Sequence, residues 1–346
     1  MILLNKECDM RTARLKEEGR AYYHCVTRIV GREFLLTDHE KRRLCKLMRQ
    51  METFTGTNIL THAFLDNHFH ILMEVPERVE ISDEEFKKRL SAIYTEDTVN
   101  RVMKVIADYR SNDDHALADM EKEKYTYRMY DLSEFMKTYK QKYTMSYNKR
   151  HDRKGTLWEE RFNSVLVEGS RHALLATAAY VDLNPVRAGI VDDPKDYRFC
   201  GYGEAVAGRK DARGGLLGIL ESEGVSGTWK EISGLYREQL YIAGEQRGTG
   251  EDGRPLRAGF SPEKVSQVLE ANGQLPVTEL LRCKVRYFSD GVVIGSSDYV
   301  EGVFEKYRDQ FGAKRKSGAR KMKGGGWGDL CTIRDLRLAP ITPPGS

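Results

Sequence analysis

The sequence predicts an α+β fold with a ferredoxin-like antiparallel sheet and packed helices. Three observations lead to this prediction: several short β-rich segments, long helical segments between them, and a tight-turn pair that joins two of the strands. Along the chain the order is strand, helix, two strands, helix and strand, which describes a ferredoxin-like sandwich. A chain of 346 residues can bury a sizeable core and is long enough for two domains.

The core elements share clear propensity signals and short polar connections. They are a strand at 21–30, a helix from Thr37 through Met51, strands at 58–65 and 68–75 joined by Asp66-Asn67, a helix at 132–147 and a strand at 164–168. Residues 80–130 are highly charged and helical in character. We therefore expect that stretch to be an insertion that elaborates the basic fold.

The most informative feature is a pair of histidines, His68 and His70, within the third strand. Because Phe69 and Ile71 fall on one face of that strand, both imidazoles fall on the other face. Two adjacent imidazoles on the non-core face of a half-buried strand are suited to bind one metal ion. The alternative is a pair of surface histidines, and the spacing alone does not decide between the two.

A second feature is a helix of small residues that carries one large phenol. Ser170 is a suitable N-cap, and Pro185 disfavours helical geometry at Asn184, so the helix should end there. Tyr180 lies away from the leucine stripe of this helix, with Asn184 one turn further on. The alternative is a tyrosine that only packs against another element.

Other aromatic residues compete for a functional role. Tyr139, Tyr143 and Tyr147 recur every four residues, which places them on one helix face. Such a stripe is more typical of a core or a stacking surface than of a nucleophile. Trp158 is a core anchor or a base-stacking platform, and the core is favoured. His24, His62 and His172 have no partner at metal-ligand spacing, so we expect them to be structural.

Together these features resemble the single-tyrosine HUH transposases, and more specifically the REP-associated tyrosine transposases. The matching motifs occur in the family's order: the H-x-H strand, the run from Tyr147 to Trp158, the stretch Trp158-Glu-Glu-Arg-Phe162, and Tyr180-x-x-x-Asn184-Pro-Val-Arg-Ala-Gly189. The resemblance covers residues 18–205. It implies the same ferredoxin-like fold, with the histidines on the sheet and the tyrosine on a helix alongside.

The resemblance also implies a chemistry. Tyr180 would be the nucleophile that cleaves single-stranded DNA beside a hairpin, leaving a 5′-phosphotyrosine and a free 3′-OH. A phenol ordinarily has a pKa near 10. It therefore needs a divalent cation, Mg²⁺ or Mn²⁺, which polarises the phosphate. His68, His70 and Asn184 would be the metal ligands, and an amide oxygen suits these hard cations.

Two other functions remain open from the sequence. One is a DNA-hairpin-binding protein that does not cleave and acts as a regulator or in chromosome structure. The other is a replication-initiation enzyme or relaxase with the same chemistry. The sequence has no second nuclease tyrosine motif and no helicase-type phosphate loop, which argues against this function.

Basic residues cluster in two places and are expected to contact DNA phosphates. Near the tyrosine helix they are Lys149, Arg150, Arg153, Lys154 and Arg161. Residues 314–323 hold six basic and no acidic residues, of which we expect contacts from Lys314, Arg315, Lys316, Arg320 and Lys321. An ordinary solvated tail is the alternative for this second cluster.

The composition divides the chain into three parts: a catalytic domain at 1–205, a linker region at 206–258 with glycines at 244–253, and a mainly helical DNA-contacting module at 259–346. Within that module, the run Gly295-Ser-Ser-Asp298 should lead into a helix through Phe304 and Tyr307.

The remaining composition sets outer bounds. The net charge is only +4, so a nucleic-acid surface must come from local clustering. The cysteines are scattered without paired spacing, which indicates neither a disulfide framework nor a structural zinc site, and they are Cys8, Cys25, Cys45, Cys200, Cys283 and Cys331. No stretch resembles a signal segment or a membrane span. We expect a cytoplasmic monomer or homodimer.

Overall fold

The computed structural model describes most of the chain. The described residues are 10–12, 14–221, 228–230, 233, 236, 240, 287–322, 327–334, 336 and 338–340. The expected linker glycines at 244–253 and the first part of the expected C-terminal module, 259–286, lie outside the described residues. Within the described part, no helix is both long and apolar enough to cross a membrane.

The predicted ferredoxin-like core is confirmed. Its elements are β2 (Ala21–Arg28), α1 (Asp38–Thr55), β3 (Asn58–Phe64), β4 (His68–Val75), α5 (Leu132–Arg150) and β5 (Asn163–Val167). The four strands lie in the order β3-β4-β2-β5, and each neighbouring pair is antiparallel. Helix α1 runs one turn past its predicted end because Phe54 is still buried, and Gly56 then caps it in the left-handed region.

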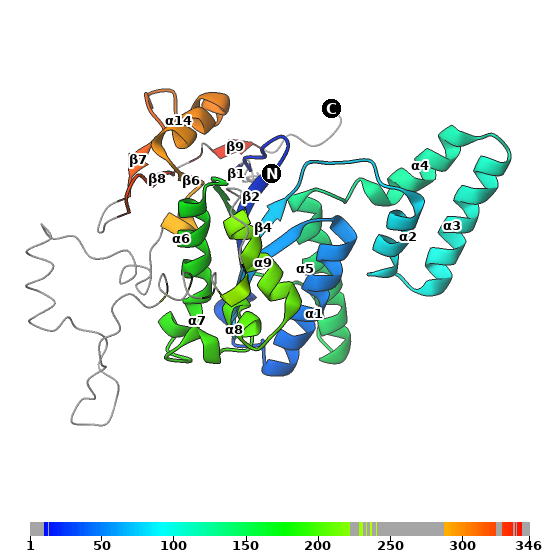
Figure 1. Cartoon of the computed structure of the whole chain (residues 1–346), viewed down its shortest axis with the longest axis horizontal. Helices are drawn as coiled ribbons and strands as arrows, with labels where there is room; N and C mark the ends of the chain where they lie inside the picture. The colour runs from blue at the N-terminus through cyan, green and yellow to red at the C-terminus, as the bar shows by residue number, and fades with distance from the viewer. Residues whose placement is uncertain are drawn as a thin grey trace, which may run out of the picture.

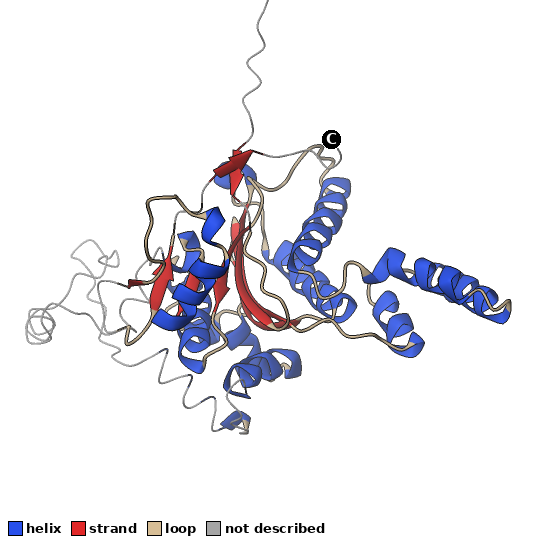
Figure 2. Cartoon of the chain, turned by 90° about the horizontal axis from the view of Figure 1, so that it is seen from above, coloured by secondary structure: helices blue, strands red, loops and turns tan. Residues whose placement is uncertain are grey.

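Residues 80–130 form three helices, as their charged helical character predicted. These are α2 (Asp83–Ser91), α3 (Glu96–Ser111) and α4 (His115–Thr126). They project from one side of the molecule, beyond α1 and α5, in both overall views (Figures 1 and 2). The insertion therefore leaves the sheet itself unchanged.

Helices cover both faces of the sheet (Figure 2). On one face Phe69 contacts Tyr139 of α5, with ring centroids 5.6 Å apart, and Trp158 at the same distance. Trp158 is buried in this layer, which confirms its core role, and so are Tyr139, Tyr143 and Tyr147. On the other face lies α6 (Arg171–Asp182), followed by the short α7 (Asn184–Arg187).

The described C-terminal residues extend the same sheet. Strand β6 (Val293–Gly295) pairs in parallel with β5, β8 (Cys331–Ile333) pairs with β6, and β7 (Arg320–Lys321) pairs with β8, so the sheet has seven strands. The expected helix is present as α14 (Ser297–Lys306), after the short α13 (Tyr287–Asp290). The sequence predicted a mainly helical module and missed these strands, because segments of two or three residues show no alternation.

Short elements complete the described part. They are the strand pair β1 (Met10–Thr12) with β9 (Leu338–Pro340), the 3₁₀ turns η1 (Val30–Arg32), η2 (Pro194–Asp196) and η3 (Arg308–Gln310), and the helices α8 (Gly201–Val206) and α9 (Lys210–Glu221).

Helix α9 corrects the predicted start of the linker at residue 206. It packs on β3, with Leu216 and Ile219 buried. Gly215 makes this packing possible, because a Cβ at that position would lie 2.3 Å from the carbonyl oxygen of Ile59. Gly215 thus reflects the close approach of a helix to a strand rather than a linker, and the first structural unit continues to at least residue 221.

Candidate catalytic site

The site begins with the register between strands β2 and β4. His70 lies opposite Val26, and because side chains two residues apart share a face, His24 projects on the same side as His70. The two rings stack with centroids 5.1 Å apart, and His24 Nε2 lies 2.9 Å from His70 Nδ1. His24, expected to be only structural, is therefore the direct partner of a predicted metal ligand.

A hydrogen-bond chain fixes the tautomers of these two rings. His24 Nδ1 lies 2.8 Å from the backbone carbonyl oxygen of Phe288, which can only accept, so this nitrogen carries the proton. In a neutral His24 the Nε2 atom must then accept, and His70 Nδ1 donates to it. His70 Nε2 is left with the lone pair that a metal ion requires.

His68 is oriented in the same way. Its Nδ1 lies 2.7 Å from the side-chain oxygen of Asn67, so it donates there and its Nε2 keeps the lone pair. The rings of His68 and His70 are 5.2 Å apart. His68 and His70 are therefore arranged alike: each ring donates a hydrogen bond from Nδ1 and has its lone pair on Nε2. Two such nitrogens are suitable ligands for a divalent metal ion.

Burial keeps the inner histidines neutral. Desolvation lowers the pKa of His24 to about 4. Desolvation is also the main reason that the pKa of His70 lies well below its usual value, with smaller contributions from His24 and His68. A neutral imidazole is the form that binds a metal ion, so His70 needs no deprotonation near neutral pH.

Helix α6 brings Tyr180 to the same place. The phenol ring lies edge-on to His24 and His70, with centroids 5.9 Å and 6.1 Å away. It stacks on Phe288 of α13, with ring centroids 4.7 Å apart. The guanidinium of Arg187, a residue of α7, lies 4.0 Å from the centroid of the Tyr180 ring. The predicted nucleophile and the predicted ligand pair therefore share one face of the sheet.

The surroundings of Tyr180 differ from the prediction in one respect. The sequence placed it on a face away from the core stripe, yet its side chain is only 2 % exposed. The reason is that α6 is covered on both sides, by the sheet and by the C-terminal residues. His172 at the start of α6 pairs with Asp329 at 2.9 Å, and Trp327 lies against Phe288 at 5.9 Å.

Asn184, the predicted third ligand, lies one turn beyond Tyr180 at the start of α7. Its Nδ2 donates to the carbonyl oxygens of Tyr180 and Val181, both at 3.2 Å. These bonds hold the amide so that Oδ1 is the atom left to act as a ligand. Its ligand role stays a prediction.

Three residues of this site were not predicted from the sequence. His24 could have been found by aligning its strand with the H-x-H strand, because alternation places it on the histidine face. Arg187 belongs to the quoted motif after Tyr180, although no role was given to it. Phe288 could not have been found, because more than a hundred residues separate it from Tyr180 and its own helix has only four residues.

The predicted phosphate contacts fall into two groups. The exposed ones are Lys149, Lys154, Arg161, Lys314, Lys316, Arg320 and Lys321. The others are half-buried and bonded within the protein. Arg150 pairs with the buried Glu40 at 2.5 Å, Arg153 donates to the carbonyl oxygen of Thr156, and Arg315 donates to that of Gly318. The first group is the better candidate for DNA contact.

Comparison with known proteins agrees with this site. Residues 18–98 match the profile of the family described as "Transposase IS200 like". The match covers less than a quarter of the 346 residues, and it shows that this stretch is similar to that family. The match includes β2, α1, β3 and β4 with His24, His68 and His70, and it ends inside α3 of the insertion.

One solved structure is also similar to this chain. It is described as a REP-associated tyrosine transposase bound to a REP hairpin, with 14 % identity and a TM-score of 0.33, covering 57 % of this chain and 86 % of that one. No curated protein matches the chain.

Proposed function

We propose that this protein cleaves and rejoins single-stranded DNA next to hairpins, with Tyr180 as the nucleophile. The observation that carries the proposal is the position of the Tyr180 ring beside His24 and His70, on the face where both His68 and His70 offer Nε2. A tyrosine that served packing alone would not require two histidines with matched tautomers.

The reaction follows from the chemistry of a phenol. The Tyr180 oxygen attacks the scissile phosphorus while the bond from phosphorus to the 3′ oxygen breaks. The phenol proton passes to solvent, and the departing 3′ oxygen takes up one proton to become a 3′-OH. The 5′-phosphotyrosine keeps the phosphoester bond, so that attack by a 3′-OH on this ester reverses the step and rejoins a strand.

The protein's own residues orient the reacting group. Phe288 and Arg187 both contact the Tyr180 ring, and His24 fixes the ring of His70. A Mg²⁺ or Mn²⁺ ion bound by His68, His70 and Asn184 would polarise the scissile phosphate and stabilise charge in the transition state.

The substrate class rests on the motifs around Tyr180 and on exposed basic residues. Lys149 and Lys154 lie at the end of α5 and in the loop after it, and Arg161 lies just before β5. These side chains would hold phosphates, and their contribution would weaken with salt. The resemblance of the sequence to REP-associated enzymes favours short palindromic hairpins and a cytoplasmic site of action.

Covalent capture tests the proposal. The protein is incubated with labelled hairpin oligonucleotides that carry single-stranded flanks, with Mg²⁺ or Mn²⁺, and run on a denaturing gel. We expect a protein–DNA adduct in the wild type and in the control Tyr127→Phe, whose side chain is 47 % exposed just after α4. Tyr180→Phe should give no adduct while it binds the hairpin as before. An adduct that survives Tyr180→Phe would refute this nucleophile.

A second candidate function is a hairpin-binding protein that does not cleave. The burial of Tyr180 against Phe288 favours it, because a nucleophile must meet its phosphate. The same oligonucleotides distinguish the two functions: tight binding on a native gel without any metal-dependent adduct would establish the binding protein.

A further inference from the structure

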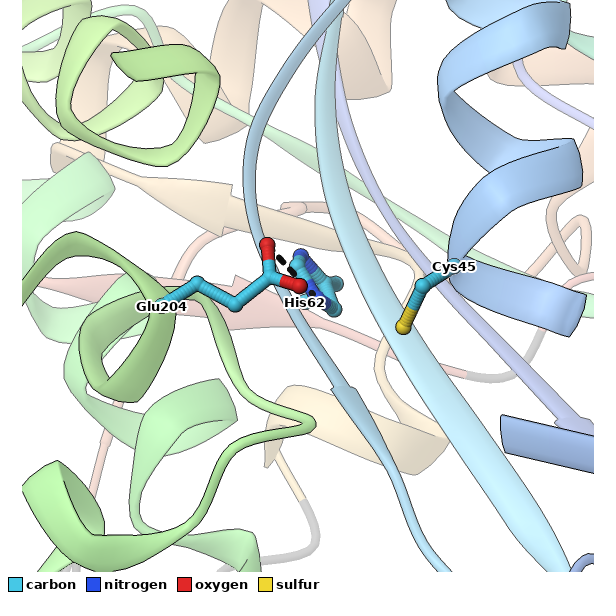
Figure 3. Close-up of side chains that lie close together, drawn as sticks. All are labelled: Cys45, His62 and Glu204. Carbon is cyan, nitrogen blue, oxygen red and sulfur yellow. Dashed lines mark ion pairs between the residues drawn. The ribbon is translucent and has the colours of Figure 1, made fainter. Parts of the chain in front are cut away.

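A second cluster of metal-ligating side chains lies on the other face of the sheet. His62 is opposite Ile71 in the pairing of β3 with β4, whereas Ala63 is opposite His70. Because side chains alternate along a strand, His62 points away from the catalytic histidines. Cys45 of α1 and Glu204 of α8 reach toward it from either side (Figure 3). One ligand atom from each residue lies within 4.8 Å of the other two.

His62 is fully buried, and among the described residues neither of its ring nitrogens has a hydrogen-bond partner. Leaving a buried polar group unpaired costs about 1–3 kcal/mol. The Oε2 atom of Glu204 lies 3.8 Å from His62 Nε2, beyond hydrogen-bond length. The ring thus offers a buried nitrogen lone pair beside a thiol and a carboxylate.

A nearby cation does not satisfy this cluster. Arg49 Nη2 lies 3.9 Å from Glu204 Oε2, but Arg49 Nη1 bonds Glu52 at 2.8 Å. The positive charge of Arg49 is therefore shared with a second carboxylate. It also lowers the pKa of His62, after burial, and so keeps that ring in the neutral, ligating form.

The donor types select the metal. A thiolate, an imidazole and a carboxylate are the ligands of Zn²⁺, whereas Mg²⁺ and Ca²⁺ take oxygen ligands. Zinc at roughly 2.0–2.3 Å from each donor requires tetrahedral ligand atoms roughly 3.5 Å apart. Rotation of the Cys45 and Glu204 side chains, neither of which is fully buried, would close the remaining distance.

The cluster opens onto a cavity of about 700 Å³. Cys45 and Glu204 both line it, so the side of the cluster away from His62 is accessible to solvent. The other lining residues are largely cationic, and these are Arg42, Lys46, Arg49, Lys88, Arg198 and Arg209. Three protein ligands and an open fourth position form the usual arrangement of a zinc site that keeps a water molecule.

We propose that Cys45, His62 and Glu204 bind a Zn²⁺ ion whose fourth ligand is a water molecule from this cavity. Binding forms a bond between zinc and Sγ and releases the thiol proton to solvent. Two anionic ligands then balance the charge of the ion. Such an ion would join α8 to α1 and β3, which lie much earlier in the chain, and it would stabilise the folded chain by mass action.

Cobalt substitution tests the proposal with a signal that only a thiolate ligand produces. Metal-free protein receives one equivalent of Co²⁺, and the near-ultraviolet sulfur-to-cobalt absorption is recorded. We expect the band in the wild type, its loss when Zn²⁺ is added, and its absence in Cys45→Ala. The catalytic pair contains no thiol, so the double variant His68→Ala, His70→Ala should retain the band.

The matched control is Cys331→Ala, which removes a buried thiol on β8 and should leave the band unchanged. A wild-type protein that shows no band with one equivalent of Co²⁺ would refute the site, and so would a band that persists in Cys45→Ala.

A second variant covers the event that Cys45→Ala does not fold. Glu204→Gln keeps the thiol and removes one of three protein ligands, so it should weaken Zn²⁺ binding at least about tenfold. Equal Zn²⁺ affinity in Glu204→Gln and the wild type would remove Glu204 from the ligand set and refute the proposed trio. Because the readouts are metal binding alone, they are independent of whether DNA is cleaved.

Discussion

The two faces of one sheet treat their histidines differently. On the face of α6, His68 and His70 each donate from Nδ1 to a fixed acceptor, which leaves Nε2 prepared for a ligand. On the opposite face, His62 has no acceptor for its N–H among the described residues, and it lies beside the thiol of Cys45 and the carboxylate of Glu204. The difference between the two faces is therefore the hydrogen bond at the non-ligating nitrogen, rather than burial. His68 and His70 have this bond and are preorganised as ligands, whereas His62 does not.

The largest expected effect separates the two faces by activity. His68→Ala or His70→Ala should lower metal-dependent cleavage more than about 100-fold, since loss of a ligand costs more than loss of its supporting partner. His62→Ala should leave cleavage close to that of the wild type, because His62 faces away from Tyr180. The measurement is the rate of adduct formation. If His62→Ala lowered cleavage as much as His70→Ala, the two faces would not be functionally separate.

The next prediction concerns the distant residue that closes the catalytic face. Phe288 is fully buried, and its ring stacks on Tyr180. Phe288→Ala should lower the free energy of unfolding by about 3–5 kcal/mol, because it leaves a cavity beside that ring. Urea denaturation measures this. Phe34→Ala, where the side chain is 76 % exposed, is the control and should change the stability little. A small effect at Phe288 would mean that the C-terminal residues do not hold Tyr180.

A smaller effect is expected at His24, which acts through His70. His24→Ala removes the acceptor of the His70 Nδ1 proton, so cleavage and metal affinity should fall about 10–100-fold. The test is the metal concentration that gives half-maximal cleavage, which should rise in His24→Ala. His24→Gln supplies a side-chain acceptor again and should recover part of the loss. An unchanged metal requirement would reduce His24 to a packing residue.

The smallest effects are expected at the basic residues and separate DNA contact from folding. Lys154→Gln should weaken hairpin binding and lower the salt-dependence slope by about 0.7–0.9, the value for one phosphate contact. Arg150→Gln breaks the pair with buried Glu40, so it should instead lower stability. Binding titrations at several salt concentrations, together with thermal melts, give both quantities. Equal salt slopes for Lys154→Gln and the wild type would exclude Lys154 from the interface.

The sequence predicted local structure where the periodic signal was long. Strand β4 has eight residues, and its alternation alone placed His68 and His70 on one face. The same logic failed for β6, β7 and β8, which have two or three residues each. Composition also misled the prediction around Gly215, because a glycine that allows close packing cannot be distinguished by composition from a linker glycine.

The sequence by itself determined the core topology, the H-x-H pair, the tyrosine helix and the resemblance to a transposase family. All of these depend on residues close together in the chain or on motifs in a fixed order. Only the tertiary structure decided that the backbone carbonyl oxygen of Phe288 accepts a hydrogen bond from His24 and that Cys45 and Glu204 approach His62. These contacts join residues tens to hundreds of positions apart. Strand pairing and helix packing bring them together, and no spacing in the sequence records that geometry.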